Sequence, residues 1–143
     1  MRDELKIRKA IMKDIPDLIA IVRGVKSIED YPGEYNRNYF IKMLKGHFVL
    51  SAELNGKILG FAEFEMDKHA KRVFLESIAI AKEFRGRGIA SKLLEEVELF
   101  AKNKGLKLIS MLVRDWNTDM NYLVKKKKYR KSDNFYLWEK RLS

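Results

Sequence analysis

The sequence has no cysteine among its 143 residues. Disulfide bridges, thiolate zinc sites and a cysteine nucleophile are therefore excluded. Histidine is nearly as scarce, because only His47 and His69 are present and they are far apart in the chain. This scarcity disfavours a dedicated metal site, so we expect no metal cofactor. His69 follows Asp67-Lys68 in a polar segment and is interpreted as a solvated turn residue.

Long apolar runs are also missing. No stretch of about 18 apolar residues, the length needed to cross a bilayer, occurs in the chain, and Met1-Arg2-Asp3-Glu4 lacks the apolar core of a signal peptide. We therefore expect a cytoplasmic protein with no membrane partner. No linker, repeat or low-complexity tract divides the sequence, and 46% of its residues are hydrophobic. Residues 1–143 are predicted to form a single domain with its own core.

Acidic residues are outnumbered, with 20 against 30 lysines and arginines, and the formal net charge is +10. Such an excess suits nucleic acid, an acidic membrane surface or an anionic cofactor. No nucleic-acid readout motif accompanies the charge, and no aromatic residue interleaves with the basic run Lys125–Lys128. A nucleic-acid partner is therefore less favoured than an anionic cofactor.

The stretch from Val73 to Gly105 carries the strongest pattern. Residues Val73–Ile80 form a mostly apolar run of strand length, which Glu76 and Ser77 interrupt. A helical period of apolar residues follows and ends in a lysine-rich turn before Gly105. The stretch therefore predicts a strand, a turn and a long amphipathic helix. The apolar positions of that helix are Ile89, Leu93, Leu94, Val97, Phe100 and Ala101.

The turn Arg85-Gly86-Arg87-Gly88-Ile89-Ala90 contains two glycines, two arginines and no bulky side chain before Ile89. Several backbone N–H groups can therefore face one way at the start of the helix, which makes an anion cradle. The alternative is a tight turn with solvated arginines. A Walker A loop is excluded because no lysine followed by Ser or Thr comes after the last glycine, and a dinucleotide fingerprint needs a glycine at Ser91.

The residues before this stretch predict a strand, two helices and a β-hairpin. Alternating apolar and basic residues indicate a strand over Leu5–Ala10. Asp14-Ile15-Pro16-Asp17 begins a helix that ends near Gly24, and a short helix is expected over Tyr39–Lys45. Between these helices lies the turn-rich segment Ser27–Asn38.

Asn55-Gly56 separates two strand-like segments, His47–Leu54 and Lys57–Met66, and this arrangement predicts a hairpin. Gly60 within the second segment indicates a bulge or close packing. A strand-helix-strand unit after the hairpin implies a parallel crossover. The last predicted elements are a strand at Leu106–Val113, a helix at Thr118–Lys126 and a strand at Ser132–Arg141.

The glycine turn resembles the acetyl-CoA signature of the Gcn5-related N-acetyltransferase (GNAT) superfamily, Arg/Gln-x-x-Gly-x-Gly/Ala, in which Arg85, Gly88 and Ala90 fill the defined positions. The resemblance extends from Leu5 to about Tyr136. It implies a mixed α/β fold, with a central sheet of about six to seven strands and about four flanking helices. It also implies that the pantetheine arm of acetyl-CoA lies in a gap between two splayed strands. The cofactor-binding residues that it implies are Ile78, Ala79, Ile80, Arg85, Gly86, Arg87, Gly88, Ile89, Ala90, Ser91 and Asn117.

The C-terminal part departs from the family pattern. Leu75-Glu76 and Asp115-Trp116-Asn117 are especially similar to the diamine/polyamine acetyltransferases. Many relatives continue as Asn-x-x-Ala-x-x-x-Tyr-x-x-x-Gly-Phe, and Asn117 fits the first position. Val124 replaces the tyrosine whose phenol protonates the departing thiolate, and the other differences are Met120, Lys128 and Tyr129.

Other residues are weaker candidates for the site. Tyr122 lies about 200° from Val124 round a helix, so it is interpreted as a packing residue. The resemblance implies that Ser27–Asn38 lines the acceptor side, with an ordinary loop as the alternative. Further candidates for lining the site are Glu65, Tyr129 and Tyr136.

The chemistry of amine acetylation requires a base. A lysine-like amine, with a pKa of about 10.4, is almost entirely protonated at pH 7 and attacks a thioester only when it is neutral. Glu76 is similar in position to the family's catalytic base, although a structural strand carboxylate is the alternative. The sequence therefore predicts an enzyme that transfers acetyl from acetyl-CoA to a primary amine. A nonenzymatic CoA-binding or regulatory module is the main alternative, and homodimer formation and the acceptor (polyamine, small metabolite, protein N-terminus or lysine) stay open.

Overall fold

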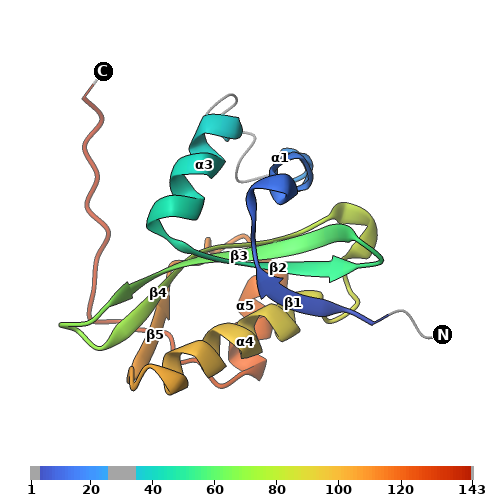
Figure 1. Ribbon diagram of the computed structural model, residues 1–143. Coiled ribbons are helices and arrows are strands. Elements are labelled where there is room, and N and C mark those ends of the chain that lie inside the picture. The colour runs from blue at the N-terminus through green and yellow to red at the C-terminus, as the bar shows by residue number, and fades with distance from the viewer. Residues whose placement is uncertain (1–3, 26–34, 143) are drawn as a thin grey trace. The chain divides into compact units, whose positions relative to one another are not determined.

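The computed structural model describes residues 4–25 and 35–142 (Figure 1). The chain divides into two compact units, Met1–Leu112 and Val113–Ser143, and the second contains α5 (Thr118–Lys126). The single domain expected for residues 1–143 stays a prediction. Among the described residues, no helix has the length and apolar character needed to span a membrane. The first unit contains, in order, β1 (Lys6–Lys9), η1 (Met12–Asp14), α1 (Ile15–Arg23), α3 (Arg37–Gly46), β2 (Phe48–Leu54), β3 (Lys57–Asp67), β4 (Arg72–Ile80), η2 (Lys82–Phe84), α4 (Ile89–Asn103) and β5 (Leu108–Met111).

The first unit is built on one sheet with the strand order β1-β2-β3-β4-β5. The strands from β1 to β4 pair antiparallel with their neighbours, whereas β5 lies parallel to β4. The parallel crossover through α4 is therefore confirmed. Figure 1 shows α1 and α3 over one face of this sheet and α4 over the other.

The number of strands differs from the expectation, because the sheet has five strands rather than six to seven. The predicted strand at Ser132–Arg141 is wrong, since no strand is present there in the described structure. Side chains in this segment are strongly exposed, with Phe135 at 80% and Trp138 at 88%. Residues of high strand propensity form a strand only where a neighbouring strand packs against them and pairs their backbone groups.

Each face of the sheet has its own apolar core. Phe61 and Phe64 are three residues apart on β3, so their side chains point to opposite faces. Phe61 packs edge-on against Phe40 of α3, with ring centroids 6.1 Å apart. Phe64 packs against Phe100 of α4 at 5.0 Å, and Leu93 of the same helix is fully buried. The amphipathic helix expected after the glycine turn is therefore confirmed.

The turn between β2 and β3, and Gly60 within β3, agree with the sequence prediction. Asn55 and Gly56 both have positive φ, 51° and 79°, which suits the tight two-residue turn of a β-hairpin. At Gly60 an added Cβ would lie 2.6 Å from the Ile80 side chain and 3.0 Å from the Ala79 carbonyl oxygen. Close packing of β3 on the end of β4 therefore explains the glycine at this position.

An ion pair joins β1 to the start of α1. Arg8 donates to both carboxylate oxygens of Asp14, at 2.7 and 2.9 Å, and the Ile11 N–H donates to the same carboxylate at 2.9 Å. Asp14 is only 3% exposed. Burial alone raises the pKa of Asp14, but the bonds from Arg8 and Ile11 and the Arg8 charge outweigh it, so this pKa lies below its ordinary value.

Asp14→Asn should lower the free energy of unfolding at pH 7 by roughly 1.5–3 kcal/mol, the range for hydrogen bonds to charged groups. Because the folded-state pKa of Asp14 is lowered, this contribution is present above the unfolded pKa of about 3.9 and is lost as pH falls through the folded pKa. Urea unfolding from pH 7 to pH 2 should show the difference from wild type shrinking below about pH 4. The exposed Asp133→Asn serves as control, and a difference for Asp14→Asn that stays constant with pH contradicts the prediction.

Candidate active site

The edge of β4 that faces β5 becomes unpaired partway along the strand. β5 pairs with β4 only from Arg72 to Leu75. From Glu76 to Ile80, no strand among the described residues pairs with this side of β4, although β3 continues along the other side. Backbone groups on the open edge are therefore available to a ligand that adds to the sheet as a strand does. The pairing of the two strands ends at Leu75 and Met111, while a gap that holds the pantetheine arm stays a prediction.

A β-bulge marks the point where the edge opens. Glu63 of β3 is opposite Ser77 of β4, and the next residue, Phe64, is opposite Leu75. Glu76 is therefore the extra residue on β4. Bulges bend a strand and redirect side chains, and they are enriched next to active sites. The predicted base is the residue at this bulge.

Carboxylates and a histidine gather beside the bulge. His47, between α3 and β2, places its Nδ1 2.6 Å from Oε2 of Glu63 and its Nε2 2.8 Å from Oε1 of Glu65. Glu63 is buried at 3% exposure, whereas the Glu65 side chain is 50% exposed. The Tyr39 hydroxyl donates to Oε1 of Glu63 at 3.5 Å. We call Glu63, Glu65, Glu76 and His47 the carboxylate–histidine cluster.

The pKa of Glu76 is raised above its ordinary value. Partial burial is the largest cause, followed by a hydrogen bond with Glu65 and by repulsion from Glu65 and Glu63, while the charge of His47 opposes these effects. A carboxylate with a raised pKa is a better base for an ammonium group than an ordinary one. Burial and the charge of Glu63 raise the pKa of Tyr39 as well, so its phenol stays protonated.

Sequence reasoning named Glu76 and Glu65 but missed His47 and Glu63. The available signal was the pattern Glu63-x-Glu65, which places two acids on the same face of a strand. That pattern alone gives no indication that a buried acid faces a histidine. The segment Ser27–Asn38, which was expected to line the acceptor side, falls mainly outside the described residues. Its described residue Tyr35 lines a cavity of about 10 Å³ together with Tyr39, Phe40, Phe61, Glu63 and Ser77.

The glycine turn has the backbone form expected of an anion cradle. Gly86 and Gly88 have φ of 76° and 80°, and Gly88 is the N-cap residue of α4. No side chain caps this end of the helix, and its first turn contains no acidic residue. The first N–H groups of a helix have no partner within the helix, so those following Gly88 can donate to a bound anion.

Arg85 holds the turn in place. Its Nε donates to the Ile80 carbonyl at the end of β4 at 3.1 Å, and a terminal nitrogen donates to the Gly24 carbonyl after α1 at 2.9 Å. The guanidinium of Arg87 lies 5.1 Å from the centre of the Phe84 ring. Arg85 thus connects three elements around the cradle, while the direct contact of Arg85 and Arg87 with a cofactor stays a prediction.

In the second unit, Asn117 caps α5. Its Oδ1 accepts a hydrogen bond from the Met120 N–H at 3.1 Å. Val124 is half-buried within α5, whereas Tyr122 is 70% exposed and Tyr136 is 82% exposed. The interpretation of Tyr122 as a packing residue receives no support from this exposure. The contact of Asn117 with the cofactor stays a prediction.

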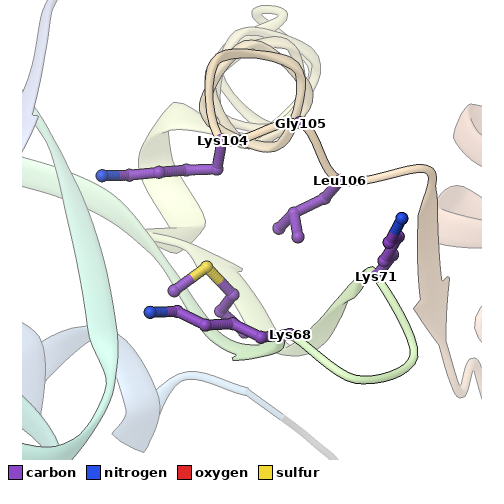
Figure 2. A pocket seen from close by; sticks show the side chains of 6 residues that line it. Lys68, Lys71, Lys104, Gly105 and Leu106 are labelled. Carbon is purple, nitrogen blue, oxygen red and sulfur yellow. The ribbon is translucent and has the colours of Figure 1, made fainter.

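A larger cavity, of about 370 Å³, lies elsewhere in the first unit. Figure 2 shows Leu106 pointing into it, with Lys68 and Lys104 on one side and Lys71 on the other. It lies past the C-terminal end of α4, and that helix has 15 residues. A helix of this length extends roughly 22 Å, so this cavity is far from the cradle at Gly88. Among the described residues, no group of His, Asp or Glu side chains is arranged to hold a metal ion.

Comparison with known proteins identifies a family and relatives of this chain. A model of the acetyltransferase (GNAT) family matches residues 15–127. An uncharacterized N-acetyltransferase from Archaeoglobus fulgidus is 28% identical over 120 residues, which cover 76% of this chain and 82% of the relative. A thialysine N-epsilon-acetyltransferase from Bos taurus is 38% identical over 47 residues, which cover 33% of this chain and 28% of that protein.

Solved structures show the same fold. The crystal structure of the PaiA N-acetyltransferase from Thermoplasma acidophilum in complex with coenzyme A superposes with a TM-score of 0.82 at 20% identity. The similarity covers 92% of this chain and 93% of the other. The mixed α/β fold implied by the glycine signature is therefore confirmed, with fewer strands than expected.

Proposed function

This chain belongs to the acetyltransferase (GNAT) family and is an acetyl-CoA-dependent N-acetyltransferase, and on that premise we propose that it acetylates a cationic primary amine that Glu76 deprotonates. The observation that carries this proposal is the position of Glu76, which lies at a bulge where the edge of β4 opens. Partial burial and the nearby acids Glu65 and Glu63 raise its pKa. The proposed base and the strand edge proposed for the cosubstrate thus lie on one strand.

The cosubstrate fits the features of the first unit. We propose that the pantetheine arm lies along Ile78, Ala79 and Ile80, whose strand edge is unpaired on one side among the described residues. The pyrophosphate then reaches the turn Arg85–Ser91, where backbone N–H groups donate to its oxygens. An added Cβ at Gly86 or Gly88 would meet no atom within 4 Å, so the space above the turn is open to a ligand. Asn117 is proposed to contact the same arm.

The carboxylate–histidine cluster suits a positively charged acceptor. A primary amine arrives as an ammonium ion at pH 7, and Glu63, Glu65 and Glu76 place negative charge close together with His47 as their neighbour. Glu76 takes one proton from the ammonium group. The neutral nitrogen then attacks the acetyl carbonyl carbon, the C–N bond forms, and the C–S bond breaks with release of the CoA thiolate. The acylated nitrogen loses its second proton to water, which leaves a neutral amide.

The departing thiolate needs no phenol at position 124. A thiol of ordinary acidity has a pKa of about 8.5, so a thiolate is a fair leaving group near neutral pH and takes a proton from water afterwards. Val124 is therefore compatible with turnover. Polyamines, small metabolites, protein N-termini and lysine side chains are all primary or N-terminal amines that this chemistry accommodates.

Thiol release from acetyl-CoA, measured with a panel of amines, tests the proposed function. We expect turnover with at least one primary amine and none with its N,N-dimethyl analogue, which has no proton left to lose after acetyl transfer. Acetyl-CoA binding measured in parallel by calorimetry separates failure of catalysis from failure of binding. Binding of acetyl-CoA without turnover on any amine class would contradict the proposal.

A further inference from the structure

The larger cavity of the first unit lies between two loops that are far apart in the sequence. One loop is the turn between β3 and β4, and the other follows α4. The Lys107 N–H donates to the Lys71 carbonyl at 2.7 Å, so a backbone hydrogen bond ties the two loops together. The volume of about 370 Å³ is within the range of small-molecule sites. We call this space the lysine cavity, and the residues that line it are Met66, Lys68, Lys71, Lys104, Gly105 and Leu106.

Three lysines surround this cavity. Figure 2 shows Lys68 and Lys104 along one side and Lys71 on the other. None of the three forms an ion pair with an acidic residue in the part of the chain that the structure describes. Asp67, the acid of the same turn, accepts a hydrogen bond from the Ala70 N–H at 3.0 Å. Three positive charges therefore lie around a cavity that has no carboxylate in its lining.

The end of α4 beside the cavity presents few free acceptors. A helix C-terminus normally disfavours an anion because its last carbonyl groups have no partner within the helix. Here three of these carbonyl groups accept N–H donors from the residues after the helix, at 3.1, 2.9 and 3.1 Å: Phe100 from Lys104, Ala101 from Leu106 and Lys102 from Gly105. The helix dipole is an alternative reason for a lysine at position 104, which is the C-cap. That reason does not apply to Lys68 and Lys71, because they belong to the turn between β3 and β4.

The cavity also has an apolar part. Met66 and Leu106 are half-buried, and Leu106 points into the cavity (Figure 2). The methylene groups of the lysine side chains add further apolar surface. A ligand that matches this lining combines several negative charges with an apolar body.

We propose that the lysine cavity binds a small organic polyanion, whose charged groups contact Lys68, Lys71 and Lys104 and whose apolar body rests on Met66 and Leu106. Lysine ammonium groups act as point charges, so they accept anionic oxygens of either carboxylates or phosphates. The site is separate from the proposed cosubstrate site, because the cavity and the glycine turn lie at opposite ends of α4. Binding in the cavity does not require acetyl transfer.

Benzene-1,3,5-tricarboxylate is the probe, because it carries three negative charges on an apolar ring. In calorimetry on the full chain, we expect one saturable site that binds this probe at least about tenfold more tightly than benzoate, which has the same ring and one charge. Citrate lacks the ring and should bind more weakly than the probe. Added salt should weaken binding of the probe, since the contacts are between charges. Its affinity should be the same with and without acetyl-CoA.

The double variant Lys71→Asn/Lys104→Gln removes two of the three charges. Lys71 has φ of 52°, a left-handed value that asparagine adopts more readily than lysine, so the turn should keep its fold. We expect the dissociation constant of the tricarboxylate to rise about tenfold or more, because two charge-assisted contacts are lost from a partly solvated site. Lys42→Gln/Lys45→Gln is the matched control, because it removes two exposed lysines of α3 that do not line the cavity.

Methyl NMR of the methionines locates the probe independently. The Met66 signal, assigned with Met66→Leu, should shift with the same midpoint as the calorimetric titration. The signal of Met12, an exposed residue of η1, should stay in place.

Four outcomes would overturn the site. The first is the absence of saturable binding of the tricarboxylate. An equal loss of affinity in the two double variants, or a Met66 signal that does not move, would mean that the probe follows diffuse surface charge. Displacement of the probe by acetyl-CoA would instead place it at the glycine turn.

Discussion

Glu76→Gln should lower turnover by about 10²–10⁴-fold, the range that general-base catalysis contributes. Glutamine preserves the size of the side chain and can still donate a hydrogen bond to Glu65, so the bulge in β4 should persist. The variant cannot accept the ammonium proton. Because the sites proposed for the pyrophosphate and the pantetheine arm are elsewhere on the strand and turn, acetyl-CoA affinity should stay within about twofold.

The pH–rate profile adds a second test of this variant. In wild type the rising limb reports Glu76, whose pKa is raised, so activity should appear at a pH above the ordinary range of a glutamic acid. Without the base, the rate should follow the small fraction of neutral amine and keep rising toward the amine pKa of about 10.4. Glu83→Gln, an exposed acid in η2, is the control. A loss of acetyl-CoA affinity with unchanged turnover would instead make Glu76 a structural residue.

The strand β4 carries both the proposed base and the edge proposed for the cosubstrate. Toward β3 it is fully paired apart from the bulge, and the bulge brings Glu76 close to the acids of β3. Toward β5 it is paired only as far as Leu75. Glu76 is thus both the first residue of β4 beyond the pairing with β5 and the residue that the bulge redirects. The proposed base and the open backbone edge are therefore adjacent on one strand.

Local features of the fold were predictable from sequence because single residues determine them. The Asn55-Gly56 hairpin and the Gly88 turn both require positive φ, which glycine and asparagine adopt at little cost. The buried face of α4 follows from its apolar period. These predictions needed no knowledge of what lies across the sheet.

The carboxylate–histidine cluster could not be predicted in the same way, because it depends on register. Glu76 is the extra residue of β4 between Leu75 and Ser77, so its position relative to the acids of β3 depends on this bulge. A shift of one residue moves a strand side chain to the opposite face, and no local pattern marks the position of the bulge. Likewise, the high strand propensity near Phe135 gave a strand prediction without specifying any strand that pairs with it.

Arg85 illustrates a second limit of sequence reasoning. The resemblance gave it a cofactor role, whereas its side chain binds the Ile80 and Gly24 carbonyls. A motif records that a residue type occurs at a position, and an arginine that shapes the cradle fits this pattern as well as one that binds phosphate. We therefore propose the backbone of the turn as the main donor to the anion.

Gly88→Glu should therefore raise the dissociation constant of acetyl-CoA by roughly 100-fold or more. Charge-assisted hydrogen bonds contribute about 1.5–3 kcal/mol each, and the loss of two such bonds gives roughly 3–6 kcal/mol. The glutamate adds a negative charge beside the phosphates and a side chain in the space above the turn. Gly88 also has φ of 80°, so a side chain there costs about 1–2 kcal/mol of folding free energy.

Gly105→Glu separates this strain from the effect on the cosubstrate. Gly105 follows the other end of α4 and has φ of 71°, and, as at Gly88, an added Cβ meets nothing within 4 Å. Both variants should therefore lose similar stability in thermal unfolding. Only Gly88→Glu should lose acetyl-CoA affinity in calorimetry, because only the N-terminal end of the helix presents free N–H groups to the pyrophosphate. Equal affinities for acetyl-CoA in the two folded variants would remove the turn Arg85–Ser91 from the binding site.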